Sequence, residues 1–308
     1  MRIIFLFILV TSVSSSFSQQ DPQFSQNMFL KLAVNPGYAG TSWATCATAA
    51  YRNQWVGFPG NPKTFVFLAD GLIKKLHGGI GGKFIDDRLG NFHFQKASII
   101  YSYHLPVGAT GLLGVGAEGT YVRTTVTNYW TPPSGQIIND SSTISSNFNM
   151  GLGAYYRATR LYLGLSVSKL LPQKLCTSFG CDYSTMPNYY LMAGYNIPLS
   201  QKINAEPSVF LKSDAVVTTF DANLLLKYAN RFWIGASYRL QDAVCFMGGI
   251  AVNPNMESTI KIGYTYDLGI SALRFYHHNT HEILISYCFR KNKTQHTPAP
   301  PPVPLLNK

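Results

Sequence analysis

The most constraining feature of this chain is a strict alternation of apolar and polar residues that recurs between about residues 45 and 290. In ESTIKIGYTYD, for example, Ile260, Ile262, Tyr264 and Tyr266 fall on one face, with polar or small residues between them. Successive side chains of a β-strand point to opposite sides, so the pattern predicts strands with one apolar face. TTFDANLLLKY, RFWIGASYRL and HEILISYCFR alternate in the same way.

Fourteen segments show this alternation, and several reach the roughly ten residues that a tilted strand needs to cross a bilayer. They lie near residues 45–52, 63–70, 77–87, 92–104, 112–123, 147–157, 160–168, 188–197, 203–213, 218–228, 231–240, 243–252, 257–266 and 281–290.

Two architectures produce such strands: a soluble sandwich with apolar faces inside, and a membrane barrel with apolar faces toward lipid. Only 13% of the residues are charged, against about a quarter in a soluble domain. The polar faces are mostly Gly, Ser, Thr and Asn, which suits a lumen. Aromatic residues near segment ends resemble the girdles of a barrel, namely Tyr101, Tyr103, Tyr121, Tyr155, Tyr156 and Tyr195. The sequence therefore predicts an all-β, transmembrane antiparallel barrel of about 14 strands, of the outer-membrane type.

The lengths of the connections between segments also support an outer-membrane barrel. Tight turns follow most even-numbered segments, whereas the longest loops, 124–146, 169–187 and 267–280, follow odd-numbered ones. Short turns on one rim and long loops on the other are typical of outer-membrane barrels. The short SDAVV and LQD connections are exceptions on the long-loop side. An even number of strands places both barrel ends on the periplasmic rim.

The flanks of the barrel predict three further segments. Residues 1–18 have Arg2, a short apolar run and a Ser-Phe-Ser cleavage pattern, which predicts a secretory signal peptide. Export together with the predicted barrel leads us to expect an outer-membrane location. Residues 19–44 form a polar and aromatic N-terminal segment, which we expect at the periplasmic end. Residues 291–308 form a basic, Pro-rich tail, which we expect to be disordered. The predicted barrel occupies residues 45–290.

Motifs that could carry chemistry lack the context that the chemistry needs. GVGAEG (114–119) and GGIGGK (78–83) lie in strand patterns without the helix that would bind a phosphate, so small lumen-facing residues explain them better. HHNTHE (277–282) could bind zinc but lacks helical spacing. No G-x-S-x-G elbow is present. The sequence predicts no enzyme, no cofactor and no metal.

Charged residues on the polar faces could form ion pairs that partly fill the lumen, or could set the selectivity of a pore. We favour the first interpretation because both signs of charge occur. The residues are Lys83, Glu118, Arg157, Glu206, Lys212, Asp221, Lys227 and Lys261.

The five cysteines divide into two groups. Cys176 and Cys181 are close together in a polar loop and could form a disulfide in an oxidising compartment. Cys46, Cys245 and Cys288 lie within strand patterns, where we expect small, packed apolar side chains.

Three N-terminal motifs carry a family resemblance: DPQFSQNMF, NPGYAG and YRNQW. Together with GGIGGKFIDDRLG and the THEILISYCF ending, they resemble the PorP/SprF family of the type IX secretion and gliding machinery of Bacteroidetes, over residues 20 to about 290. Gly37 stands where the family pattern usually has Ala. The matching N-terminal positions are Asp21, Pro22, Phe24, Ser25, Gln26, Met28, Asn35, Pro36, Tyr38, Ala39, Gly40, Tyr51, Arg52, Gln54 and Trp55.

The resemblance implies a barrel that assists secretion or surface attachment of cargo with a type IX C-terminal signal. It implies three kinds of partner: outer-membrane lipid, periplasmic ring or peptidoglycan-binding components, and the cargo or adhesin. Because the chain is expected to be exported, we expect no nucleic-acid partner. The alternative function is a passive porin or small-solute transporter, which requires an open lumen. We expect Phe24, Met28 and Phe29 to pack against the lumen wall, so that the segment plugs or braces the periplasmic mouth.

Overall fold

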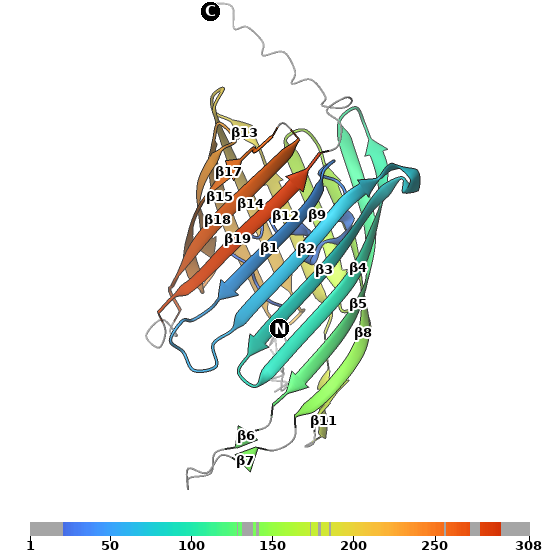
Figure 1. Cartoon of the computed structure of the whole chain (residues 1–308), viewed down its shortest axis with the longest axis vertical. Coiled ribbons are helices and arrows are strands. Elements are labelled where there is room, and N and C mark those ends of the chain that lie inside the picture. Colours follow the sequence, from blue (N-terminus) through green and yellow to red (C-terminus); the bar gives the residue numbers. More distant parts are fainter. Residues whose placement is uncertain are drawn as a thin grey trace, which may run out of the picture.

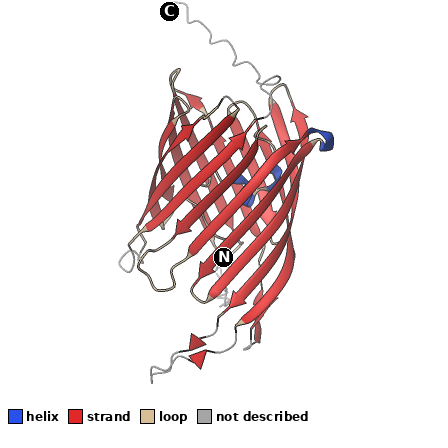
Figure 2. Cartoon of the chain, viewed as in Figure 1, coloured by secondary structure: helices blue, strands red, loops and turns tan. Residues whose placement is uncertain are grey.

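The computed structural model describes residues 21–290, except 128, 131–137, 140–141, 173, 178–179, 185, 256 and 272–277. Within these residues the chain forms a closed antiparallel barrel of 14 strands (Figures 1 and 2). The fold class predicted from the alternation is confirmed. The barrel strands are β1 (Thr45–Asn53), β2 (Lys63–Ile73), β3 (Gly78–Leu89), β4 (Phe92–Val107), β5 (Gly111–Val126), β8 (Thr143–Arg157), β9 (Leu161–Ser168), β12 (Asn188–Tyr195), β14 (Ile203–Ser213), β15 (Thr218–Tyr228), β16 (Phe232–Arg239), β17 (Ala243–Val252), β18 (Ser258–Gly269) and β19 (Thr280–Phe289).

The remaining elements are short. They are α1 (Lys31–Val34), η1 (Pro36–Tyr38), η2 (Lys74–Leu76), the β6–β7 hairpin (Tyr129–Trp130 and Ile138–Asn139), the β10–β11 hairpin (Lys174–Thr177 and Gly180–Ser184) and β13 (Ile197–Pro198). In the described part of the chain, no helix has the length and apolar character needed to span a membrane.

Each barrel strand pairs with its neighbours along the chain, and the last strand closes on the first. β1 pairs with β19, so that Cys46 stands opposite Cys288 and Arg52 opposite Glu282. Closure leaves no strand edge with unpaired backbone groups, as a bilayer requires.

The two faces of the strands show which way the barrel is turned. Leu224 and Ile262 point outward and are almost half exposed, whereas Asp221 and Thr265, on the opposite faces of β15 and β18, are fully buried. A soluble sandwich would bury the apolar residues instead. The apolar faces therefore point toward lipid and the polar faces line the lumen.

Tyr155 corrects one detail of the predicted aromatic girdle. Tyr101, Tyr103, Tyr121 and Tyr195 are exposed on the outer face, but Tyr155 is 1% exposed and lies in the lumen. Tyr155 and Tyr156 are consecutive residues of β8, and neighbouring side chains of a strand point to opposite sides. Both tyrosines therefore cannot belong to the girdle.

The two rims of the barrel differ. One rim, here called the long-loop rim, carries the β6–β7 and β10–β11 hairpins at the bottom of Figure 1. The other, the short-turn rim, carries the turns between β4 and β5, β8 and β9, and β15 and β16. β1 begins and β19 ends at the short-turn rim, as the even strand number predicted.

The structure corrects the expectation for two cysteines. Cys46 and Cys288 form a disulfide across the seam between β1 and β19, although each was expected to be a packed apolar side chain. The bond needs the closure of the barrel, because the two residues are 242 positions apart in the chain. Cys245 is a free thiol and fully buried, as expected. The side chains of Cys176 and Cys181 lie outside the described residues, so their disulfide stays a prediction.

Candidate functional site

The lumen contains the chain's own N-terminal part, residues 21–44, here called the lumenal segment. It consists of a turn, the one-turn helix α1 and the 3-10 helix η1. Asn35 begins η1: its side chain accepts a hydrogen bond from the Gly37 N–H at 2.9 Å, and Pro36 occupies the first helical position. This cap and this proline are typical signals for the start of a helical turn.

Glycines of the barrel wall let the lumenal segment touch the strands backbone to backbone. A Cβ atom at Gly114 would lie 2.2 Å from the Gly37 carbonyl oxygen, and one at Gly116 would lie 2.4 Å from the Pro36 carbonyl carbon. A Cβ atom at Gly79 would lie 2.1 Å from the Ala39 carbonyl oxygen. GVGAEG and GGIGGK therefore supply close contact with the segment, in agreement with the expectation of small lumen-facing residues.

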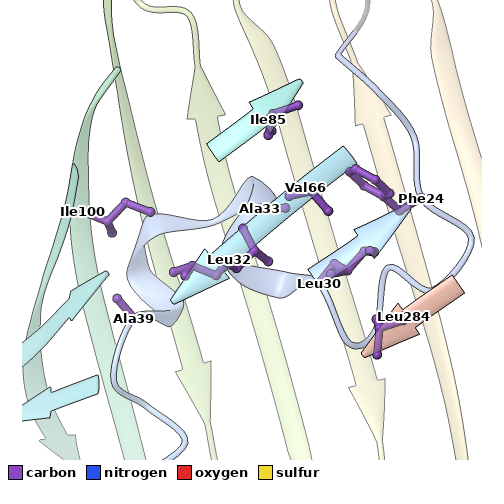
Figure 3. Packing of buried hydrophobic residues seen from close by; sticks show 11 residues of the cluster. Phe24, Leu30, Leu32, Ala33, Ala39, Val66, Ile85, Ile100 and Leu284 are labelled. Atoms are coloured by element: carbon purple, nitrogen blue, oxygen red, sulfur yellow. The ribbon is translucent and has the colours of Figure 1, made fainter. Parts of the chain in front are cut away.

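Apolar side chains of the lumenal segment pack against the inner wall. Phe24, Leu30 and Leu32 lie against Val66 of β2 and Leu284 of β19 (Figure 3). On another side of the segment, Met28 packs in a cluster with Trp233 of β16. Phe29 meets that Trp233 ring with a centroid distance of 5.3 Å. The packing of Phe24, Met28 and Phe29 on the wall is as expected.

Glu282 of β19 holds the turn of the lumenal segment. Its carboxylate is fully buried and accepts hydrogen bonds from the backbone N–H groups of Ser25 and Gln26, both at 2.8 Å. Arg52 of β1 lies 3.1 Å from Glu282 and 2.7 Å from Asp267 of β18. The Ser25 hydroxyl donates to Asp267 at 2.7 Å and accepts from Arg52 at 2.7 Å. Charge-assisted bonds of this kind are about twice as strong as neutral ones.

A second pair extends this network along the wall to β16 and β15. Arg239 of β16 lies 3.1 Å from Asp221 of β15, and both side chains are buried. The Gln23 amide donates to both carboxylate oxygens of Asp221, at 3.0 and 3.1 Å, and the Asn27 amide donates to Asp221 at 3.3 Å. The turn is therefore attached to one continuous part of the wall, which runs from β15 to β1.

Asp21 is surrounded by basic side chains. Its carboxylate lies 2.5 Å from Lys96 of β4 and 3.2 Å from Lys169, and Tyr190 of β12 donates to it at 2.7 Å. Lys212 of β14 donates to its carbonyl oxygen. Burial raises the pKa of Asp21, but the ammonium groups of Lys169, Lys96 and Lys212 outweigh burial and hold this pKa well below its usual range.

The other half of the segment is attached mainly through its backbone. Five side chains of the wall each contact a backbone group of the segment at 2.8 to 3.0 Å: Ser166 with Val34, Lys83 with Ala33, Ser102 with Gly37, His104 with Ala39, and Asp70 with Gly40. At the end of the segment, Arg157 donates to the Thr41 carbonyl oxygen at 2.9 Å.

These contacts give the position of the segment along the barrel axis. Asp21 lies near Ser168 and Lys212, at the ends of β9 and β14 close to the long-loop rim. Thr41 lies beside Arg157, at the short-turn rim. The segment therefore passes through most of the lumen, deeper than the mouth where the sequence placed it. Polar side chains of the wall contact the segment near both rims and between them.

The predicted motif residues separate into two groups. Asp21, Ser25, Gln26, Asn35, Pro36, Ala39 and Gly40 lie in the lumen, where Pro22 and Tyr38 also contribute to the walls of its cavities. Of the residues of YRNQW, only Arg52 also lies in the lumen. Tyr51 is 44% exposed on the outer face, and the backbones of Gln54 and Trp55 shape the connection to β2.

The predicted lumen charges pair only in part. Lys83 lies 2.7 Å from Glu118, and Lys227 pairs with Glu206. Arg239 and Asp267 were not among the predicted lumen charges. Each is a charged residue on the polar face of an alternating strand, so the alternation itself could have identified them.

The polar side chains of HHNTHE, which the sequence did not favour as a zinc site, do not come together. Glu282 points into the lumen, whereas His281 accepts or donates a hydrogen bond with Tyr264 at 2.7 Å on the other face of β19. His277 lies outside the described residues. No group of three potential metal ligands occurs among the residues that the structure describes.

Comparison with known proteins identifies a family. The model of the family described as "Type IX secretion system membrane protein PorP/SprF" matches residues 16–287. No curated protein sequence matches the chain.

Solved structures of similar fold are outer-membrane barrels of low sequence identity. The CymD monoaromatic hydrocarbon channel has a TM-score of 0.56 at 10% identity, covering 88% of this chain and 94% of its own. The toluene transporter TodX of Pseudomonas putida has a TM-score of 0.53 at 9% identity, covering 89% and 96%. A FadL homologue of Pseudomonas aeruginosa has a TM-score of 0.50 at 10% identity, covering 80% and 90%. At these identities the likeness concerns the fold alone.

Proposed function

This chain belongs to the PorP/SprF family of type IX secretion system membrane proteins, and we propose that it assists secretion or surface attachment of cargo that carries a type IX C-terminal signal. The observation that carries the proposal is the lumenal segment. A channel for solutes needs a free path through the lumen, and here Glu282, Asp221 and Asp21 take part in a buried network that fixes a folded segment across it. The barrel then acts through its rims rather than through its lumen.

The two rims suit different partners. The long-loop rim, which carries the β6–β7 and β10–β11 hairpins, would face the cell surface and receive the cargo or adhesin. The short-turn rim, where β1 begins and β19 ends, would face the periplasmic ring or peptidoglycan-binding components. Export of the chain with cleavage after Ser18, an outer-membrane location, a role in gliding and an origin in Bacteroidetes all belong to this proposal. The absence of a catalytic motif and the membership of a secretion family support a protein that is not an enzyme.

Surface proteomics of a strain that lacks this gene tests the proposal. We expect one or a few proteins with the type IX C-terminal signal to disappear from the surface, while uptake of small solutes stays normal. Complementation with the wild-type gene restores display. Normal display of every such protein, combined with a defect in the uptake of a small solute, would refute the proposal and establish the porin alternative.

A further inference from the structure

A basic cavity lies between the lumenal segment and the short-turn rim, and here it is called the vestibule. Its volume is about 430 Å³, within the range of roughly 300–1,000 Å³ that is usual for ligand sites. Residues of the β8–β9 turn, including Thr159, line it together with Asn196. The vestibule therefore opens toward the rim at which β1 begins.

The charges around the vestibule are unbalanced. Six basic side chains line it: Lys31, Arg157, Arg160, Lys227, Lys261 and Arg290. The two acidic side chains of the lining already have partners, since Asp70 accepts the Gly40 N–H at 2.8 Å and Glu206 pairs with Lys227. Among the described residues, Lys31 and Lys261 have no carboxylate partner within ion-pair distance. Clustered cations in a hollow with low-dielectric walls attract anions.

Aromatic rings hold the two lysines in position. The Lys31 ammonium lies 3.3 Å from the Tyr162 ring centroid and 3.3 Å from the Tyr155 hydroxyl. The Lys261 ammonium lies 5.8 Å from the Phe29 ring centroid. These ring contacts fix the positions of the two amino groups inside the vestibule.

We propose that the vestibule binds the carboxylates of a short acidic peptide segment that is presented at the short-turn rim. The lining contains tyrosine rings, leucines and hydroxyl groups besides the basic side chains. Such a mixed surface fits a peptide, which has apolar atoms and backbone polar groups between its carboxylates, better than a compact phosphate. The vestibule belongs to the barrel itself, so binding there does not depend on which cargo the protein serves.

The protonation of Lys31 gives an independent signature of binding. Burial lowers the pKa of Lys31 to about 7, opposed by Glu206 and assisted by Lys227, Arg157 and Lys261. The hydroxyls of Tyr38, Tyr155 and Tyr162 also lie nearby. Lys31 is therefore largely neutral at pH 8 in the free protein, and a bound carboxylate restores its charge. Binding at pH 8 should take up protons.

The test uses the purified full-length protein in a non-ionic detergent and a fluorescent tetraglutamate peptide. We expect saturable binding that weakens as salt is added, and no binding of tetraglutamine. The double variant Lys31→Met with Lys261→Met should bind at least about tenfold more weakly, since each charged contact that is lost is worth about that factor. Lys202→Met is the matched control, because Lys202 lies exposed on the same rim outside the vestibule, and it should bind like the wild type.

Two further measurements keep the test decisive. If the double variant fails to form a heat-modifiable barrel, Arg160→Met in the exposed β8–β9 turn replaces it and should also weaken binding. Calorimetry at pH 8 in buffers of different ionisation enthalpy should show proton uptake. The proposal is overturned if tetraglutamine binds equally well, if the vestibule variants bind like the wild type, or if tripolyphosphate binds more tightly than the peptide.

Discussion

Replacing Glu282 with Gln should release the lumenal segment from the wall. The Glu282 carboxylate accepts the Ser25 and Gln26 N–H groups at 2.8 Å and pairs with Arg52 at 3.1 Å. Glutamine keeps one acceptor oxygen but loses the charge, so one buried N–H remains without an acceptor and the ion pair disappears. Each charge-assisted bond is worth about 1.5–3 kcal/mol. Allowing for relaxation, we expect docking of the segment to lose about 2–4 kcal/mol, which is about 30- to 1,000-fold in the released population.

Trypsin cleavage after Lys31 measures that population. Lys31 lies inside the lumen in α1, so a protease can reach it only when the segment leaves the barrel. When opening and closing are fast, the cleavage rate follows the open population. Mass spectrometry of the released N-terminal peptide gives the rate. Heat-modified gel mobility shows that the barrel is still closed.

Glu257→Gln serves as the control, because it makes the same chemical change at an exposed position between β17 and β18, far from Ser25. It should be cleaved like the wild type. Equal cleavage rates for Glu282→Gln, Glu257→Gln and the wild type would show that the contacts to Glu282 do not hold the segment.

Four other outcomes are expected. Deleting residues 21–40 should leave a closed barrel and raise its single-channel conductance; unchanged conductance with normal assembly would argue against a plug. Ile262→Arg, on the lipid face, should cost about 2–4 kcal/mol of stability and impair assembly, which folding titrations into lipid would measure. Cys46→Ser should expose Cys288 to thiol reagents after unfolding and lower barrel stability by about 2–5 kcal/mol; equal labelling of the wild type under non-reducing conditions would exclude the disulfide. The pKa of Lys31 is 10.5 when the segment is released and about 7 when it is docked. The charged form of Lys31 therefore disfavours docking, and this free-energy cost is complete below pH 7 and declines between pH 7 and about 10.5. The wild-type segment should therefore be cleaved less at pH 9 than at pH 6. Lys31→Arg keeps the trypsin site and stays charged at both pH values, so it should not show this difference once the pH dependence of trypsin is subtracted with a model substrate.

The sequence alone determined the features that depend on neighbouring residues. Alternation along β15 and β18 decided which side chains share a face, because the geometry of a strand fixes that relation locally. The low charge and the long loops after odd-numbered segments then indicated a barrel. The motifs of the lumenal segment and of YRNQW pointed to the family that the comparison confirmed.

Tertiary structure decided what joins distant parts of the chain. Closure of β1 on β19 brings Arg52 to Glu282 and Cys46 to Cys288, and no local pattern encodes these pairs. The lumenal segment was expected at the periplasmic mouth, but Asp21 finds its basic partners near the long-loop rim. Its depth depends on where complementary charges and glycines of many strands meet around the lumen. That arrangement exists only once the barrel has closed, because polar groups inside it must find partners across its width.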